Sequence, residues 1–201
     1  MITLYHRAKT RSSRFIFLLE ELAAPYRIQH VTTRSHDGTG TVDPSNPHPN
    51  GKVPAISDDG VVVFESPAIA LYLTDKFPKN RLGPLAGEPA RGPYLSWLSY
   101  YTGVFEPALM SKFMNVEVKR VTAGWVPVEE AMHVIVNALS SAPYLLGDRF
   151  SAADVLYGTT FAMFAQNPLL PKSDLIDDYA RRVVGRPAYA RAQALDAPAA
   201  G

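Results

Sequence analysis

The segment 51–67 constrains the fold more than any other part of this 201-residue chain. It contains two short apolar runs, 53–57 and 61–64, separated by Asp58-Asp59-Gly60, which is a hairpin turn signal. Ser66-Pro67 follows at once, and a serine cap with proline in the first turn is typical of a helix start. The segment therefore predicts a strand, a tight turn, a second strand and a helix in immediate succession.

The first 33 residues predict a strand–helix–strand unit. Residues 2–6 and 26–33 alternate in polarity, as half-buried strands do. Between them, after a basic loop at 7–12, apolar residues recur at the spacing of one helix face: Phe15, Leu18, Leu19 and Leu22. Because a helix lies between the two strands, we expect the strands to pair in parallel.

The remaining segments set the domain organisation. Residues 34–51 are rich in small polar residues, proline and glycine, which predicts a loop with one irregular turn of helix. The first domain, 1–78, is thus expected to be α/β with the element order βαβ-α-ββα. Few large apolar residues occur just beyond it, which indicates a linker at 79–87. After the linker, 88–201 shows only helical periodicity and predicts an all-α helical-bundle domain.

Two further patterns concern the second domain. Residues 155–164 are apolar nearly all round, which predicts a buried central helix. Ser151 and Asp154 precede it at the spacing of a capping box, a structural feature. The end of the chain, 196–201, is expected to be frayed.

Composition excludes several classes of function. The chain has no cysteine, so disulfides, thiolate metal sites and a protein-borne thiol nucleophile are excluded. Its five histidines show no zinc-ligand spacing, so we expect no metal, and we interpret each as a surface or hydrogen-bonded residue. The formal net charge of +1 gives no reason to expect nucleic acid. No signal segment and no apolar run of membrane-spanning length is visible, so no membrane association and a cytoplasmic location are expected.

The segment 51–67 also predicts a binding site. Pro54 enters a strand, and a cis peptide bond there would expose the backbone of Val53 to an extended peptide ligand. Glu65 and Ser66 lie at a helix N-terminus, where free N–H groups and the helix dipole favour a carboxylate. Ser66 can add a hydroxyl and Glu65 can bind an ammonium group. The combination predicts a site for a zwitterionic peptide end.

These segments resemble a known family. The order of elements, with Gly-Lys-Val-Pro-Ala-Ile at 51–56 and the run at 61–73, is similar to the N-terminal domain of cytosolic glutathione transferases. The segments 4–6, 10–14 and 18–22 narrow the resemblance to the bacterial and fungal branch of serine-type enzymes. The segments 144–154 and 185–189 resemble the family's helix-capping segment and C-terminal signature, so the resemblance covers nearly the whole chain.

The resemblance implies a fold, an activity and an assembly. It implies a thioredoxin-like, glutathione-binding first domain followed by the helical domain. The implied enzyme is a glutathione S-transferase with glutathione as co-substrate, whose thiolate attacks a hydrophobic electrophile and can also reduce organic hydroperoxides. Detoxification and a homodimer are the family expectations. The alternative is a glutathione-fold binding or regulatory protein with little catalytic activity.

The resemblance also implies roles for individual residues. Counting back from Arg14, the catalytic hydroxyl falls at Lys9 or Thr10, and only Thr10 carries a hydroxyl. Ser12 is the second candidate, although it can equally be the helix cap. Arg11 would stabilise the thiolate by its charge. The full predicted set is catalytic Thr10 and Ser12 with glutathione-binding Arg11, Lys52, Val53, Pro54, Glu65 and Ser66.

Three groups of residues keep alternative interpretations. Lys52 resembles the residue that contacts the glycine carboxylate of glutathione, but it is equally typical of a solvated loop. Tyr5 ends the first strand, and its place in the alternation indicates a packed strand residue rather than the catalytic hydroxyl. A helix of the second domain carries aromatic and methionine side chains that suit either an electrophile pocket or the core: Tyr100, Tyr101, Phe105 and Met110.

Overall fold

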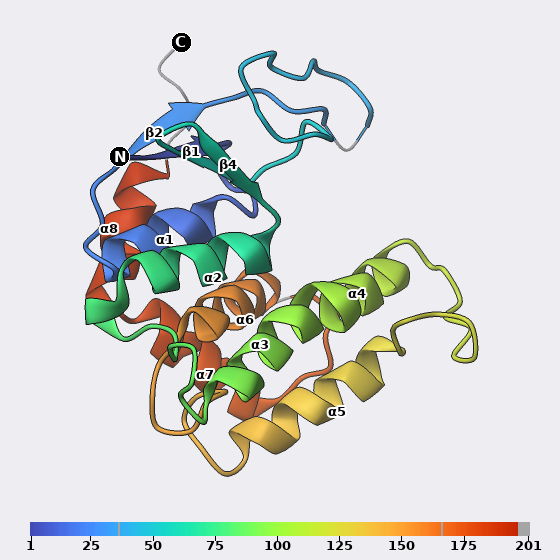
Figure 1. The fold of residues 1–201 in the computed structure, drawn as a ribbon. Helices are drawn as coiled ribbons and strands as arrows, with labels where there is room; N and C mark the ends of the chain where they lie inside the picture. The colour runs from blue at the N-terminus through green and yellow to red at the C-terminus, as the bar shows by residue number, and fades with distance from the viewer. Residues whose placement is uncertain (36, 166, 197–201) are drawn as a thin grey trace. The chain divides into compact units, whose positions relative to one another are not determined.

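The computed structural model describes residues 1–35, 37–165 and 167–196, and its chain forms two compact units (Figure 1). The first unit consists of Met1–Asn80 together with the segment from Arg186 onward, and the second is Arg81–Gly185. The sequence had placed all of 88–201 in the second domain. The last helix differs from that expectation, because it packs on the first helix of the chain.

The first unit is built on a four-stranded sheet in the order β2-β1-β3-β4. β1 pairs with β2 in parallel and with β3 in antiparallel, and β3 pairs with β4 in antiparallel. Two helices, α1 and α2, cover one face of this sheet (Figure 1). Its elements are β1 (Ile2–His6), α1 (Ser13–Glu21), β2 (Tyr26–His30), β3 (Ala55–Asp58), β4 (Val61–Phe64), α2 (Ser66–Lys76), the 3-10 turn η1 (Pro78–Asn80) and α8 (Pro187–Leu195).

The turn of helix expected between β2 and β3 is absent from the described part of 34–51, which contains only turns and bends. Side-chain and backbone bonds hold this segment instead. Asp43 Oδ1 accepts the Ser45 amide at 2.8 Å and the Ser45 hydroxyl at 2.7 Å. Local bonds of this kind compete with helix formation, and they explain why polar residues gave a loop here.

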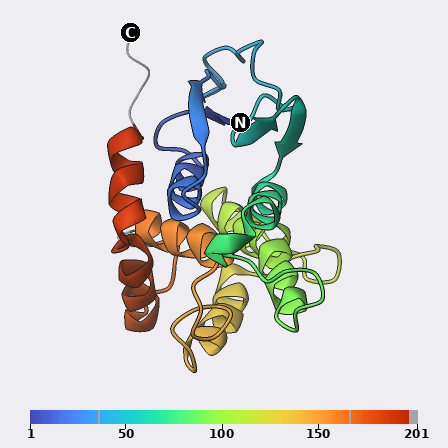
Figure 2. The same ribbon diagram turned by 60° about the vertical axis from the view of Figure 1, so that its left-hand side comes forward.

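α1 is buried on more than one side. Its whole apolar run, Phe15 to Leu19, is 0% exposed, although the periodicity assigned only one face to the core. Because α8 packs against α1, it covers the side that the sheet and α2 leave open (Figure 2). Phe17 contacts Tyr189 of α8 edge to face, with ring centroids 5.3 Å apart.

Ion pairs fix α8 on α1 as well. Arg186 donates from both Nε and Nη2 to the carboxylate of Glu21, at 2.6 and 2.8 Å. Arg191 donates to Glu20 at 2.7 Å. A bidentate arginine–carboxylate pair sets orientation as well as distance. This contact therefore helps to define how the N-terminal end of α8 is oriented on α1.

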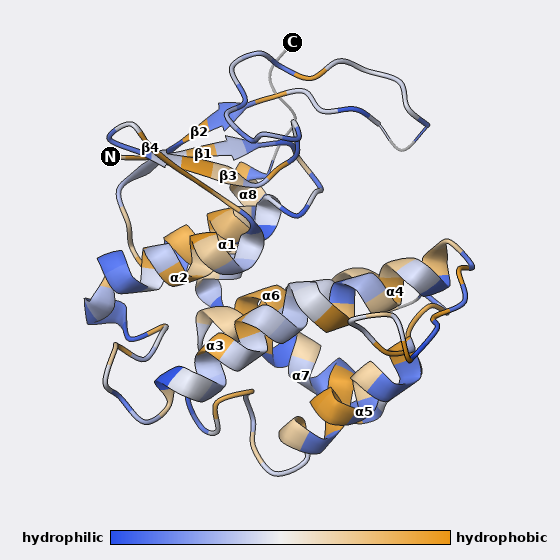
Figure 3. Ribbon diagram, turned by 45° about the vertical axis from the view of Figure 1, so that its right-hand side comes forward, coloured by the Kyte–Doolittle hydropathy of each residue, from blue (hydrophilic) through white to orange (hydrophobic). Residues whose placement is uncertain are grey.

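The regular elements among the described residues of the second unit are all helices, with one isolated β-bridge between Tyr144 and Gly147. Figure 3 shows α5 with both hydrophobic and hydrophilic residues along it, as expected for a helix with one buried face. The elements are α3 (Arg91–Tyr100), the π-helix η2 (Tyr101–Phe105), α4 (Glu106–Phe113), α5 (Val128–Leu139), α6 (Ala152–Phe164) and α7 (Asp174–Val184). α6 is the buried central helix that its composition predicted.

An aromatic cluster fills the core of the second unit. Tyr101 and Phe105 are 0% exposed and pack on Tyr157 at centroid distances of 5.0 and 5.5 Å. Tyr101 also lies within hydrogen-bond distance of Thr160, at 2.7 Å between hydroxyl oxygens. Of the two interpretations offered for these rings, the structure therefore supports the core for Tyr101 and Phe105. No helix in the described part of the chain is both long and apolar enough to span a membrane.

Candidate functional site

Three chain segments meet at one end of the sheet in the first unit. Tyr5 near the end of β1 pairs with Ala55 at the start of β3, and Ala55 pairs with Phe64 at the end of β4. The loop after β1, the entry to β3 and the exit from β4 therefore leave the sheet at the same end. Those segments carry all the residues that the sequence assigned to the site.

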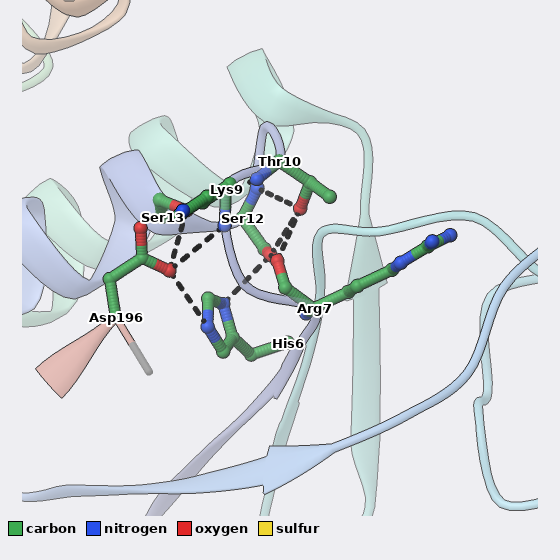
Figure 4. Close-up of polar contacts among 7 residues, drawn as sticks. All are labelled: His6, Arg7, Lys9, Thr10, Ser12, Ser13 and Asp196. Atoms are coloured by element: carbon green, nitrogen blue, oxygen red, sulfur yellow. Dashed lines mark hydrogen bonds and ion pairs between the residues drawn. The ribbon is translucent and has the colours of Figure 1, made fainter. Parts of the chain in front are cut away.

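The loop after β1 holds the two candidate hydroxyls (Figure 4). Thr10 donates its hydroxyl hydrogen to the Arg7 carbonyl at 2.6 Å, and its oxygen lies 2.8 Å from Ser12 Oγ. Thr10 is half-buried, whereas Ser12 is 0% exposed. Ser12 is the N-cap residue of α1, and its predicted catalytic role stays a prediction.

His6 and Asp196 complete the polar cluster in Figure 4. His6 is 0% exposed, with Nδ1 2.9 Å from Ser12 Oγ and Nε2 3.1 Å from Asp196 Oδ1. The same Asp196 oxygen accepts the Lys9 amide at 3.1 Å and the Ser13 hydroxyl at 2.9 Å. A carboxylate just past the end of α8 thus holds the loop that carries Thr10.

Burial and charge act in opposite directions on His6. Burial lowers the pKa of the imidazole, the Asp196 carboxylate raises it, and His30, whose ring centroid is 5.5 Å away, lowers it; the net pKa is below the ordinary value. His6 is therefore neutral at physiological pH.

The entry to β3 leaves backbone groups outside the sheet. The Val53–Pro54 peptide bond is cis, and the paired part of β3 begins at Ala55. The Lys52 carbonyl accepts Asn46 Nδ2 at 2.9 Å, while the Lys52 residue is exposed. Gly51 has φ +59°, and a Cβ there would lie 2.5 Å from Val42 Cγ1, so this approach to the strand requires glycine.

The exit from β4 forms the second half of the site. Glu65 is the N-cap of α2 and has φ +72°, a conformation that costs a non-glycine residue about 1–3 kcal/mol and recurs at ligand sites. Its side chain is 62% exposed. Ser66 begins α2, so it contributes a hydroxyl and a first-turn amide at the positive end of the helix dipole.

A buried histidine lies under Glu65. His48 Nδ1 accepts the Asn50 amide at 3.1 Å, which leaves Nε2, 3.9 Å from Glu65 Oε1, to carry the hydrogen. Burial lowers the pKa of His48, although the Glu65 carboxylate raises it. The sequence assigned His48 no role, and no pattern around it signalled this contact.

A pocket of about 610 Å³ lies beside these segments in the first unit, lined by His6, Arg7, Ala8 and Lys9 and by residues from His30 to Asp43. Arg7 is anchored across it by a 2.7 Å bond to Thr33 Oγ1. No predicted site residue lines this pocket. The predicted site residues thus lie at the sheet end, and the cavity lies beside them, with His6 in its lining.

Two further residues that the sequence did not single out belong to the site region. His6 was interpreted only as a surface or hydrogen-bonded residue, and Asp196 fell in the segment expected to be frayed. Asp196 instead contacts His6 at the end of β1, the Lys9 amide in the loop and the Ser13 hydroxyl at the start of α1. Residues 197–201, the rest of that prediction, lie outside the described residues.

Comparisons with known proteins identify the family and agree with the fold. The family model for the N-terminal domain of glutathione S-transferases matches residues 11–76. Glutathione S-transferase 3 of Schizosaccharomyces pombe is 30% identical over 177 residues, which cover 77% of this chain and 70% of that protein. A glutathione transferase of Methylococcus capsulatus superposes with a TM-score of 0.78 at 26% identity, covering 98% of each chain.

A sphingomonad glutathione S-transferase solved with glutathione superposes with a TM-score of 0.79 at 25% identity, over 96% of this chain and 98% of that one. The first unit is thus a thioredoxin-like domain. With the sheet-end site, the family-model match and the 30% identical relative together, the chain belongs to the glutathione S-transferase family.

Proposed function

We propose that Thr10 supplies the hydroxyl with which this glutathione transferase activates the thiol of its co-substrate. The observation that carries the assignment is the contrast in burial between the two candidate hydroxyls. Thr10 is half-buried at the loop surface, and Ser12 is 0% exposed beneath it. A free thiol has a pKa of about 8.5, and a hydroxyl that donates to the sulfur favours the thiolate at neutral pH.

The rest of glutathione is held by the other two segments. The first-turn amide and hydroxyl of Ser66 bind the γ-glutamyl carboxylate, because α2 directs the positive end of its dipole there. The Glu65 carboxylate binds the ammonium group. The Val53 backbone, outside the paired part of β3, binds the cysteinyl peptide unit as an added strand would.

Charged side chains complete the proposed site. The exposed Lys52 meets the glycine carboxylate, and Pro54 shapes the turn that presents Val53. Arg11 is exposed beside Thr10 and adds positive charge near the sulfur. The hydrophobic electrophile, a cytoplasmic location, a homodimer and a role in detoxification follow from the family rather than from contacts in this chain.

The test compares three variants of the two hydroxyl residues. Thr10→Val removes the hydroxyl while keeping the shape, and we expect turnover of chlorodinitrobenzene to fall by on the order of 10²-fold, as for loss of one preorganised donor. Thr10→Ser is the matched control and should keep most of the turnover. Ser12→Ala should leave a larger share of activity than Thr10→Val.

Glutathione affinity, measured by calorimetry, separates binding from activation. The Thr10→Val variant should bind glutathione within a few-fold of wild type, because the peptide is held by the other segments. Full turnover in Thr10→Val would rule out Thr10 as the activating hydroxyl. If the wild type binds glutathione but turns over no electrophile, the result favours the alternative of a binding protein.

A further inference from the structure

The β1–α1 loop contains a continuous polar chain that glutathione binding alone does not require. It runs from Asp196 through His6 and Ser12 to Thr10, with successive atom distances of 3.1, 2.9 and 2.8 Å (Figure 4). One end is the carboxylate beyond α8, and the other is the hydroxyl assigned above to the thiol. The elements that supply it are β1, the loop and the C-terminal end of α8.

The burial of its members limits the chemistry that this polar chain can perform. His6 and Ser12 are both 0% exposed, and the Asp196 side chain is 8% exposed. An aspartate–histidine–serine order is shared with hydrolases that attack carbonyl groups. Ser12 cannot act as such a nucleophile, because no substrate carbonyl reaches a fully buried oxygen. The exposed end of the chain is Thr10.

The positions of the hydrogens follow from the acceptors. Asp196 Oδ1 lies 3.1 Å from His6 Nε2, and this carboxylate favours a hydrogen on that nitrogen, which is buried and makes no hydrogen bond to the described residues. Nδ1 of the neutral ring is then a bare acceptor, and the Ser12 hydroxyl donates to it. Ser12 Oγ in turn accepts the Arg7 amide at 3.2 Å and can accept the Thr10 hydroxyl.

Both hydroxyls have a competing acceptor. The Arg7 carbonyl lies 2.6 Å from Thr10 Oγ1 and 3.1 Å from Ser12 Oγ. Without a ligand, the Thr10 hydrogen can therefore rest on that carbonyl. A thiol that donates to Thr10 would polarise this hydroxyl and favour donation onward to Ser12, because hydrogen bonds in a chain strengthen one another.

We propose that the polar chain from Thr10 through Ser12 to His6 and Asp196 is a proton relay that moves the thiol proton of bound glutathione to His6. The proposal rests on Thr10 contacting the sulfur, as assigned above. The S–H bond breaks and its proton passes to Thr10 Oγ1, the Thr10 hydrogen passes to Ser12 Oγ, and the Ser12 hydrogen passes to His6 Nδ1. A thiolate and an imidazolium remain, each hydroxyl again carries one hydrogen, and the net charge is unchanged.

The transfer also reverses the direction of the hydrogen bonds. After it, His6 donates to Ser12, Ser12 donates to Thr10, and Thr10 donates to the thiolate. Bonds to a charged sulfur are stronger than bonds between neutral groups. The same three side chains therefore remove the proton and then stabilise the anion.

The Asp196 carboxylate stabilises the buried imidazolium that the transfer produces. An isolated imidazolium in the interior is strongly disfavoured, and a carboxylate at 3.1 Å compensates for it. Among the described residues, the titratable groups that face His6 are Asp196 from the C-terminal end of α8 and His30 from β2. Since His30 opposes the positive charge, Asp196 is the group that allows His6 to accept a proton.

The first test counts protons. Thiolate formation is followed by its absorbance near 240 nm, and proton release is followed by calorimetry in buffers of different ionisation enthalpy. S-Methylglutathione, which has no thiol proton, is the control ligand. The relay predicts that glutathione forms thiolate at pH 7 with almost no more proton release than S-methylglutathione. Release of one extra proton per thiolate would overturn the relay.

The second test uses a variant at each of two anchors of α8. Asp196→Asn keeps the shape of the side chain but removes its charge, and we expect the thiolate fraction at pH 7 to fall at least several-fold. Arg186→Gln, which removes the pair with Glu21, is the matched control because it loosens the same helix without touching the relay. If both variants lower the thiolate fraction equally, docking of α8 rather than proton transfer explains the effect and the relay is overturned.

Nitrogen-15 NMR of the histidine ring gives a readout that needs no catalysis. In the free protein, His6 should carry its hydrogen on Nε2 and have a bare Nδ1. Nδ1 should become protonated on addition of glutathione and stay bare with S-methylglutathione. A hydrogen on Nδ1 in the free protein would overturn the proposed direction.

A wild type that binds glutathione without forming thiolate overturns the assignment of Thr10 and the relay with it, whereas thiolate accompanied by full proton release overturns the relay alone.

Discussion

Asp58, the last residue of β3, is buried and faces two donors of α2. Its Oδ2 accepts the Tyr72 hydroxyl at 2.6 Å and a short bond from Lys76. The Lys76 bond and then the Tyr72 bond hold the pKa of Asp58 below its usual value. This carboxyl therefore contributes stability above its unfolded pKa of about 3.9, and that contribution is lost as pH falls through the lower folded pKa.

Asp58→Asn should remove that acid-sensitive part of the stability. We expect the free energy of unfolding, measured with urea between pH 7 and pH 3, to fall less steeply below about pH 4 in the variant than in the wild type. Asp59→Asn is the control, because the neighbouring Asp59 side chain is 82% exposed. If the free energy of unfolding falls equally steeply below about pH 4 in the wild type and in Asp58→Asn, Asp58 is not the source of the acid sensitivity.

At this scale the sequence predicted residues whose role is local. The Asp59-Gly60 turn has positive φ at both positions, as the hairpin signal required, and Glu65-Ser66 begins α2 as expected. His6 and Asp196 were missed because their contact spans nearly the whole chain. A single histidine in a strand and a single aspartate after a helix carry no periodic signal, so only the packing of α8 brings them together.

At the scale of one element, α6 depends on the carboxylate at its N-terminus. Asp154 is 0% exposed and accepts the Ser151 amide at 2.8 Å, the Leu145 amide at 3.0 Å and the Tyr179 hydroxyl at 2.9 Å. The predicted capping box is confirmed. It also joins the preceding turn and α7 to the helix start, which the local pattern could not indicate.

Loss of this carboxylate should therefore cost more than loss of the cap hydroxyl. We expect Ser151→Ala to lower the free energy of unfolding by about 0.5–2 kcal/mol. Asp154→Ala leaves several buried donors unpaired, and at about 1–3 kcal/mol for each such group it should cost clearly more. Urea denaturation measures both, with Ser173→Ala at the cap of α7 as the control for an ordinary helix cap. Equal losses at Ser151 and Asp154 would show that the carboxylate serves α6 alone.

The elements differ in how far their own residues define them. β4 and α2 occur at the residues that the turn and cap signals indicated. The π-helix Tyr101–Phe105 was not predicted, because the apolar spacing of the flanking helices runs through it without a break. It lies where Tyr101 and Phe105 pack against Tyr157 of α6.

At the scale of the whole molecule, the exposed apolar surface bears on assembly. The edge strand β4 carries Val61, Val62 and Phe64, which are 57%, 41% and 42% exposed. An unpaired edge strand with large exposed apolar residues is a surface that soluble proteins usually cover. We propose that a second copy of the chain covers this surface in the homodimer that is expected from the family.

Val62→Lys should accordingly weaken the dimer, because it places a charge on the surface that the partner would cover. We expect wild type to sediment at twice the 22.0 kDa of one chain, and the variant to dissociate toward a single chain as the concentration falls. Val121→Lys, at a position that is fully exposed in a loop of the second unit, is the matched control and should leave the sedimentation unchanged. A wild type that sediments as one chain would exclude the dimer, and a dimer indifferent to Val62→Lys would place its interface away from β4.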